Sequence, residues 1–175
     1  LRAISYPTID HRGPEFSEMT KNIIEGLKDV VKGRESTPII FPSSGTGAWE
    51  ASLVNILSEG DRILMFETGH FSTLWKTMAE KLGFNVEYIG GDWRSGVDAE
   101  KIADVIKKDK DHDIKAICMV HNETSTGVTS KIPSIIKIIK SLRHPAIIMV
   151  DTISSLGSID YSHDDWNVDV TVAVA

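Results

Sequence analysis

The sequence predicts an α/β fold of three layers, in which helices cover both faces of a mostly parallel sheet. Two observations carry this prediction. Short, nearly continuous apolar runs alternate with longer segments whose apolar residues recur every three or four positions. Runs that are apolar throughout are typical of parallel strands buried on both faces, because an exposed face would place polar residues at every second position.

The first expected element is an amphipathic helix that begins at Pro14, a residue favoured in the first helical turn. Its apolar residues are spaced three or four apart: Phe16, Met19, Ile23, Leu27 and Val30. Strands are then expected at 38–41, 62–67, 85–90, 114–120 and 146–151, and in the final run VDVTVAVA. Helices are expected between them, at about 47–57, 71–82, 98–108 and 133–142.

Composition excludes several classes of protein. The chain has 175 residues and a net charge of −6, which argues against a nucleic-acid or anionic-membrane surface. No apolar run is long enough to span a membrane, and the first residues do not have the pattern of a signal peptide. Cys118 is the single cysteine and lies within an apolar run, so we interpret it as a buried structural thiol. A cytoplasmic location is expected, since no internal disulfide can form.

Four polar segments are expected at the carboxyl ends of strands, where ligands bind in parallel sheets. All four are rich in Gly, Ser and Thr: SSGTG (43–47), ETGHF (67–71), HNETSTG (121–127) and DTISS (151–155). The third is the most unusual, because a solvated turn rarely needs so many hydroxyl groups. No Gly-x-Ser-x-Gly elbow is present, which disfavours a serine nucleophile.

Each of these segments also has a purely structural interpretation. Gly45-Thr46-Gly47 is either a turn capped by Ser44 or Thr46, or an anion site at a helix start. The dinucleotide-binding and P-loop patterns are both absent there. Phe71 is either a core aromatic or a ring that stacks on a planar ligand. Asp151 is either a turn cap or a partly buried carboxylate that holds a cation. Histidine spacing gives no support to a metal site.

Together these motifs resemble the class V aminotransferases of the pyridoxal-phosphate fold type I group, and most of all the serine–glyoxylate and alanine–glyoxylate branch. The matching pieces span nearly the whole chain: SYPTIDHRGPEF, PSSGTGAWEA, ETGHF, HNETSTGV and VDTISSLG. The resemblance implies an N-terminal helical segment at 1–36 and a cofactor-binding large domain at 37–175.

The resemblance also implies roles for individual residues. Thr46, Gly47 and Ala48 would hold the phosphate of pyridoxal 5'-phosphate. Phe71 and Ile153 would pack on opposite faces of its ring. Thr124 would hydrogen-bond the phenolic oxygen, and Asp151 would pair with the protonated ring nitrogen.

The implied reaction transfers an amino group from serine or alanine to glyoxylate, giving glycine and a 2-oxo acid, in a homodimer. The family's Schiff-base lysine has no counterpart, because no lysine follows Lys140. We therefore expect a large domain truncated before that lysine, without the small C-terminal domain and inactive alone. Another fold type I enzyme, such as a cysteine desulfurase or a lyase, and a non-catalytic binding or assembly domain remain alternatives.

Overall fold

Helices and strands alternate along most of the chain, as the sequence predicts. The structure, a computed structural model, describes residues 2–174. After a short 3-10 turn, its helices are α1 (Pro14–Val31), α2 (Gly45–Ile56), α3 (His70–Lys81), α4 (Ala99–Lys108), α5 (Ile132–Ser141) and α6 (His163–Trp166). Its strands are β1 (Arg62–Phe66), β2 (Asn85–Ile89), β3 (Ile114–Val120), β4 (Asn122–Glu123), β5 (Val128–Thr129), β6 (Ile147–Asp151) and β7 (Val170–Val172).

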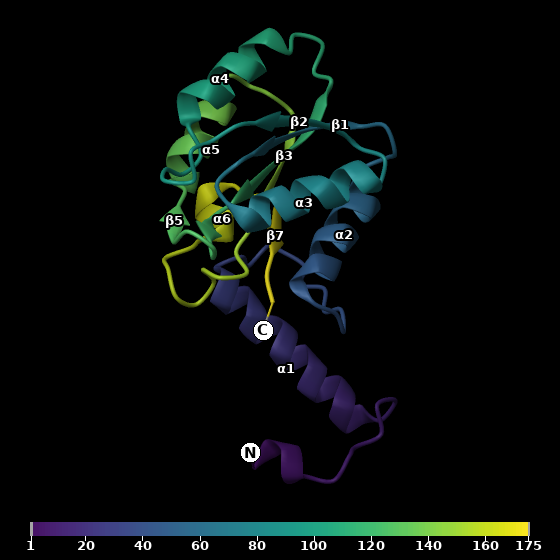
Figure 1. Cartoon of the computed structure of the whole chain (residues 1–175). Helices are drawn as coiled ribbons and strands as arrows, with labels where there is room; N and C mark the ends of the chain where they lie inside the picture. Colours follow the sequence, from purple (N-terminus) through teal and green to yellow (C-terminus); the bar gives the residue numbers. More distant parts are fainter. Residues whose placement is uncertain (1, 175) are drawn as a thin grey trace.

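Five strands form one sheet in the order β2-β1-β3-β6-β7. Every neighbouring pair in it is parallel. Helices α2 and α3 pack together on one face, while α4 packs against α5 on the other (Figure 1). The predicted α/β fold with helices on both faces of a parallel sheet is therefore confirmed.

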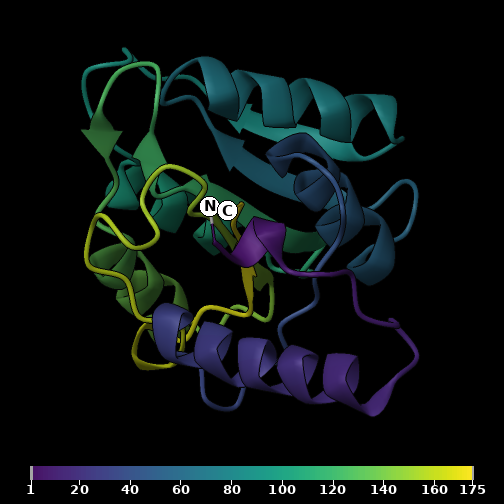
Figure 2. The same ribbon diagram turned by 90° about the horizontal axis from the view of Figure 1, so that it is seen from below.

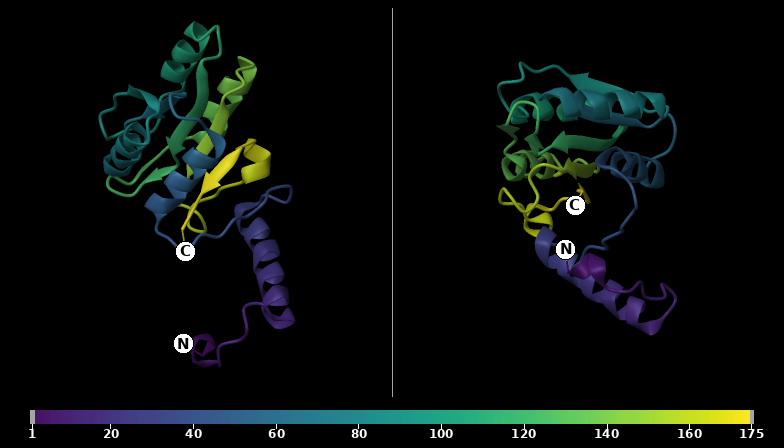
Figure 3. Two further views of the ribbon diagram at one scale, coloured as in Figure 1. Left: turned by 90° about the vertical axis from the view of Figure 1, so that its right-hand side faces the viewer. Right: turned by 60° about the horizontal axis from the view of Figure 1, so that its bottom comes forward.

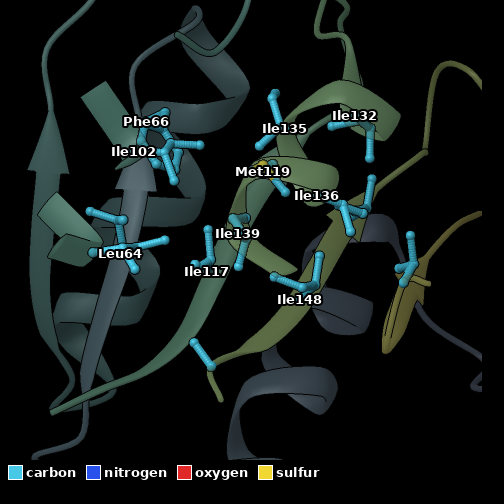
Figure 4. Packing of buried hydrophobic residues seen from close by; sticks show 14 of the residues in the cluster. Leu64, Phe66, Ile102, Ile117, Met119, Ile132, Ile135, Ile136, Ile139 and Ile148 are labelled. Atoms are coloured by element: carbon cyan, nitrogen blue, oxygen red, sulfur yellow. The ribbon is translucent and has the colours of Figure 1, made fainter. Parts of the chain in front are cut away.

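Alternation along the strands divides the core into two apolar clusters. Leu64 and Phe66 of β1 face α4 and α5, where they meet a group of isoleucines (Figure 4). Ile63 and Met65 point the other way, toward α2 and α3. Successive strand side chains alternate between faces, so β1, β2, β3 and β6 each contribute to both clusters. Burial on both sides explains why these runs contain so few polar residues.

The lone cysteine belongs to the cluster on the α2 and α3 face. Cys118 is 2% exposed, and burial raises its pKa to about 12. A thiol with so high a pKa is protonated at neutral pH and is a poor nucleophile. The interpretation of Cys118 as a structural residue is confirmed.

The predicted strand at 38–41 was wrong. Residues 37–41 form neither helix nor strand, and Ile39 and Ile40 are 70% and 59% exposed. Two prolines, Pro38 and Pro42, flank this apolar run, and proline cannot donate a backbone hydrogen bond to a neighbouring strand. The glycine-rich segment at 43–47 therefore does not follow a strand, although it does begin a helix.

The first helix forms where it was predicted, but it buries none of its residues. α1 extends away from the α/β body (Figure 3). Met19, Ile23 and Val30 are 42%, 46% and 52% exposed. Its C-terminal end is joined to the body through hydrogen bonds, among them Asp164 N–H to Lys32 O at 3.2 Å. Seen from below, the helix lies beside the loop that leads to β7 (Figure 2). Three residues of its apolar stripe are therefore exposed, and the other two, Phe16 and Leu27, are half-buried.

A buried charged group secures the amino end of the sheet. Asp109 ends α4 and accepts hydrogen bonds from the N–H groups of Asp113 and Ile114 at 3.1 and 2.9 Å. Its Oδ2 lies 3.1 Å from His144 Nε2, and Arg62 Nη1 lies 3.5 Å from Oδ1. The N–H of Ala146 donates to His144 Nδ1, so Nε2 carries the hydrogen that faces Asp109. Burial raises the pKa of Asp109, but these hydrogen bonds and the Arg62 charge outweigh it and hold the pKa below 3.8.

Candidate active site

The parallel sheet changes its direction of winding between β1 and β3. From β1 the chain passes through α3 to β2 on one side, and from β3 it passes through α5 to β6 on the other. Helix α3 covers one face of the sheet and α5 the opposite one. Ligands of parallel α/β sheets bind at such a switch point, outside the carboxyl ends of the strands. Two of the segments singled out in the sequence, 67–71 and 121–127, leave the sheet here.

A buried carboxylate joins these two segments. Glu123 is fully buried, and its Oε1 and Oε2 accept the N–H groups of Phe71 and Ser72 at 3.2 and 3.1 Å. Ser125 adds its own N–H at 3.2 Å and its hydroxyl at 2.8 Å. The donor N–H groups of Phe71 and Ser72 lie in the first turn of α3, where the helix dipole favours a negative charge. Glu123 therefore fixes the polar segment after β3 to the helix that begins with His70.

The second buried carboxylate belongs to Asp151, the last residue of β6. It lies on the same face as Met149, two residues earlier, and so points toward α2. Asp151 is 3% exposed. Its Oδ1 accepts the N–H of Ile153 at 2.8 Å, and its Oδ2 accepts the indole N–H of Trp49 at 3.0 Å. The turn cap considered from sequence is thus present, together with a second bond across the fold.

Burial controls the ionisation of Asp151. Loss of hydration raises its pKa from 3.8 to about 6, against the lowering effect of the two hydrogen bonds. The charge of Glu123 raises it further. A carboxylate with this pKa is ionised at neutral pH yet poorly compensated within the protein. It is therefore suited to pair with a positive charge.

The start of α2 offers backbone donors. Ser44 is its N-cap residue but makes no hydrogen bond with its side chain, contrary to the capping considered from sequence. The first intrahelical bond runs from Ala48 N–H to Ser44 O at 3.1 Å. Among the described residues, the N–H groups of Gly45, Thr46 and Gly47 have no acceptor. Helix starts with free N–H groups bind anions, because the N–H dipoles point at them.

Two glycines in this turn are in close contact with their surroundings. A Cβ at Gly45 would overlap Ile153 Cδ1, which places the start of α2 against the turn after β6. A Cβ at Gly47 would overlap Ser43 Oγ and lie 2.9 Å from Ser43 Cβ. A side chain at either position would therefore force its neighbours to move.

Polar contacts also tie the turn after β3 to the turn after β6. Asn122 Nδ2 donates to Ser154 Oγ at 2.9 Å, and that hydroxyl donates back to Asn122 O at 2.7 Å. His121 Nδ1 lies 2.9 Å from Ser155 Oγ, and both residues are buried. Burial lowers the pKa of His121, an effect that the charge of Asp160 partly offsets. Hydrogen bonds thus connect the segments that follow β3 and β6 at the carboxyl edge of the sheet.

The structure brings most of the predicted site residues together. Ala48, Phe71 and Ile153 pack against the apolar cluster that contains Trp49, and Asp151 bonds to Trp49 itself. Thr46 and Thr124 are exposed at the same edge. Within residues 2–174, no hydrogen bond joins the side chain of either threonine to the other predicted residues. The segment 121–127 is also more ordered than a simple loop, because β4 pairs with β5 as an antiparallel hairpin.

Sequence reasoning missed two residues that matter here, Trp49 and Glu123. Trp49 occupies an ordinary core position in a helix, and nothing in the sequence distinguishes its bond to Asp151 from plain packing. Glu123 gave a stronger signal, since it is the one acidic residue among the hydroxyl groups of HNETSTG. Its burial depends on reaching α3, which is 51 residues away in sequence at Ser72.

The donor set fits the cofactor that the resemblance implies. Three free N–H groups at the start of α2 suit a phosphate, and a buried carboxylate suits a protonated ring nitrogen. Both groups lie against one turn, because Ile153 contacts Gly45 and bonds to Asp151. Within residues 2–174, no three His, Cys, Asp or Glu side chains are grouped closely enough to hold a metal ion. None of the helices described is both long and apolar enough to cross a bilayer.

Comparison with known proteins identifies a family. Residues 3–175 match the family described as aminotransferase class-V. The chain is 46% identical over 171 residues to serine–glyoxylate aminotransferase of Hyphomicrobium methylovorum, covering 98% of this chain and 42% of that protein. It is 40% identical over 171 residues to L-aspartate–glyoxylate aminotransferase of Paracoccus denitrificans, covering 98% and 43%.

A solved aminotransferase structure has a similar fold. Ureidoglycine–glyoxylate aminotransferase from Bacillus subtilis superposes with a TM-score of 0.85 at 26% identity. The match covers 98% of this chain and 43% of that one. The chain thus spans less than half the length of the relatives it matches.

Proposed function

The chain belongs to the class V aminotransferase family, and on that premise we propose that it is the cofactor-binding part of an aminotransferase that moves an amino group from serine or alanine to glyoxylate. The products are glycine and a 2-oxo acid. Members of this family depend on pyridoxal phosphate. We propose that this protein binds it at the edge formed by α2, Glu123 and Asp151.

The observation that carries the proposal is the state of Asp151. It is buried, each of its oxygens already accepts one hydrogen bond, and each keeps acceptor capacity for another. A buried carboxylate without a matching positive charge is costly. A cationic ring nitrogen offsets that cost, which explains why the fold retains an acid at the end of an apolar strand.

Each remaining residue has a role in this proposal. The N–H groups of Thr46 and Gly47 hold the phosphate, together with that of Gly45. The N–H of Ala48, which the resemblance implies as a third donor, instead bonds to Ser44 O at 3.1 Å. Thr124 donates its exposed hydroxyl to the phenolic oxygen. Phe71 and Ile153 enclose the two faces of the ring and exclude water from them, so that the charge on Asp151 acts through a less polar medium.

Bound at this edge, pyridoxal phosphate supplies an electron sink for the bond that breaks at the α-carbon of an amino acid. Asp151 supports that sink by keeping the ring nitrogen protonated. The proton at the α-carbon requires a base, which in this family is the lysine that holds the cofactor. No lysine follows Lys140 in these 175 residues. We therefore propose that they have no transaminase activity by themselves and work within a longer protein.

The test uses the full-length protein. Purified apoprotein is titrated with pyridoxal phosphate, and the loaded protein is then assayed with glyoxylate and one amino donor at a time. Serine, alanine, aspartate and cysteine form the donor panel. We expect the cofactor to bind and glycine to form with serine or alanine. The 175-residue chain, assayed in parallel, should form no glycine.

The other outcomes of this assay separate the alternatives. Release of sulfide from cysteine, with no glycine formed, would identify a desulfurase instead. Cofactor binding with no reaction on the whole donor panel would favour a lyase or another fold type I enzyme. No binding of pyridoxal phosphate by the full-length protein would leave a non-catalytic binding or assembly domain.

We propose further that the full-length protein is a homodimer and that α1 contributes to its interface. The support is the apolar stripe of α1, since an 18-residue helix with no buried residue exposes surface that a partner can cover. Replacing Ile23 with Asp should shift the protein toward monomer in analytical ultracentrifugation. Replacing the exposed Lys21 with Glu on the same helix is the control and should leave the dimer intact.

We also propose, from the sequence alone, that the protein works in the cytoplasm. Cell fractionation with an antibody to the protein tests this.

A further inference from the structure

Two tryptophans stack between α2 and α3, and only one of them uses its indole nitrogen. Trp49 and Trp75 are 3% and 0% exposed, with ring centroids 5.6 Å apart and planes inclined by 10°. The Nε1 of Trp49 donates to Asp151 Oδ2 at 3.0 Å. The Nε1 of Trp75 is buried and has no partner among residues 2–174. One indole of the stack therefore packs without a hydrogen bond, whereas the other bonds to Asp151.

The bond from Trp49 holds Asp151 from a second direction. Ile153 N–H belongs to the same turn as Asp151 and fixes Oδ1. One such bond leaves the carboxylate plane free to turn about its Cβ–Cγ bond. The indole N–H reaches Oδ2 from α2, 102 residues away in sequence, and fixes the plane.

Trp49 also lies in the helix whose first turn carries the free N–H groups. Gly47 is two residues before it, and α2 is a continuous helix from Gly45 onward. The distance between the anion-binding turn and Asp151 is therefore set by a rigid element and one hydrogen bond. A ligand with a phosphate at one end and a cationic nitrogen at the other would be held at both ends by this arrangement.

We propose that Trp49 is a positioning residue that holds the Asp151 carboxylate in orientation and as an anion, at a fixed distance from the start of α2. This inference rests on the proposed binding of pyridoxal phosphate. Trp49 acts through Asp151 and has no direct part in the reaction. Its effect opposes that of Glu123, the charged side chain whose field raises the pKa of Asp151.

The experiment compares two matched variants of the full-length protein, Trp49→Phe and Trp75→Phe. Each removes one indole from the same stack, but only the first removes a hydrogen bond. The affinity of the apoprotein for pyridoxal phosphate is measured by calorimetry from about pH 5 to about pH 9. Titration of the cofactor's own groups is common to all variants and cancels in the comparison.

We expect Trp49→Phe to lose affinity roughly tenfold near neutral pH, since a hydrogen bond to a charged group is lost. The pH at which affinity falls should rise by about one unit, because Asp151 then binds a proton more readily. Trp75→Phe should match the wild type in both respects.

Equal losses in the two phenylalanine variants, or an unchanged pH midpoint in Trp49→Phe, would overturn the inference. No cofactor binding by the wild type would instead reject the proposed function. A further measurement needs no substitution at position 49. In the wild-type apoprotein, the indole N–H resonance of Trp49 should shift with pH near 6, as Asp151 titrates. The resonance of Trp75 should not shift, and a flat Trp49 signal would also overturn the inference.

Discussion

Glu123 fills the space beside Gly69, so closely that position 69 cannot carry a side chain without displacement. A Cβ at Gly69 would lie 2.7 Å from Glu123 Cδ and 2.7 Å from Ser125 Oγ. Gly69 is also the N-cap residue of α3, the helix whose first N–H groups bond to Glu123. The absence of a side chain at one residue thus allows a buried carboxylate to reach a helix start.

The first prediction follows from this contact. Gly69→Ala should destabilise the protein by about 1–3 kcal/mol, because an added methyl group in a filled space forces its neighbours to shift. Cofactor affinity should fall as well, because Phe71, which is proposed to cover the cofactor ring, lies in the same turn as Gly69. Gly26→Ala is the control: nothing lies within 4 Å of a Cβ there, and alanine favours a helix. Denaturant unfolding measures the stability of both variants. Equal stabilities of Gly69→Ala and Gly26→Ala would contradict the prediction.

The contact between Gly47 and Ser43 gives a second prediction. Gly47→Ala should weaken binding of pyridoxal phosphate by the full-length protein, either through overlap with Ser43 or by blocking approach of the phosphate. The double variant Ser43→Gly/Gly47→Ala removes the overlap. Recovery of affinity in the double variant would assign the loss to packing, whereas a persistent loss supports an anion site. If Gly47→Ala bound the cofactor as well as wild type, the turn would be an ordinary helix start.

The third prediction concerns the stability of the apoprotein with Asp151→Asn. In the wild type, the raised pKa means that the folded state favours the protonated form of Asp151. The stability that this protonated form contributes is present below pH 3.8 and is lost as the pH rises through about 6. At neutral pH the variant avoids that loss, which is at most about 3 kcal/mol. One hydrogen bond is lost in exchange, at about 1 kcal/mol.

Asp151→Asn should therefore be more stable than wild type by up to about 2 kcal/mol near pH 8, and no more stable below about pH 4. It should also bind pyridoxal phosphate more weakly. Denaturant unfolding at the two pH values, together with a cofactor titration, checks both statements. A variant less stable than wild type at the higher pH would show that the hydrogen bonds of Asp151 outweigh its burial.

Asp109 should show the opposite pH dependence. Its pKa is lowered in the folded state, so the stability it contributes is present above pH 3.8 and is lost as the pH falls through the folded value. Asp109→Asn should cost roughly 2–4 kcal/mol at neutral pH, since it disturbs a buried hydrogen-bonded charge group. The difference from wild type should shrink in acid. Cofactor affinity should not change, because Asp109 lies at the amino end of the sheet.

Apolar patterning made most of the fold predictable. Most residues of the runs at 62–67 and 114–120 are buried, on both faces of the sheet, and such runs have few alternatives to a parallel sheet. The same signal failed at 38–41, where the run is equally apolar but exposed. Hydrophobicity reports that a segment favours burial, and it does not say which surface will cover it.

The candidate site was predictable only in part, for a different reason. Phe71, Asp151 and Ile153 lie at strand ends, and the alternation of strands and helices is enough to bring strand ends to one edge. The bond between Trp49 and Asp151 depends on the position of α2 along the sheet, which the periodicity of the sequence does not determine. Glu123 likewise needs the exact approach of α3. Long-range polar contacts of this kind come from packing, and a single sequence carries little trace of them.

Helix α1 has one more consequence, for the way the chain acquires its structure. A helix of 18 residues has little cooperativity of its own in water, because nucleation is costly and few turns follow it. With no buried residue, α1 gains no stabilisation from a core. In the proposed homodimer, the helical content of α1 would be linked to the partner surface that covers Met19, Ile23 and Val30, and folding of this segment would be a concentration-dependent step of assembly.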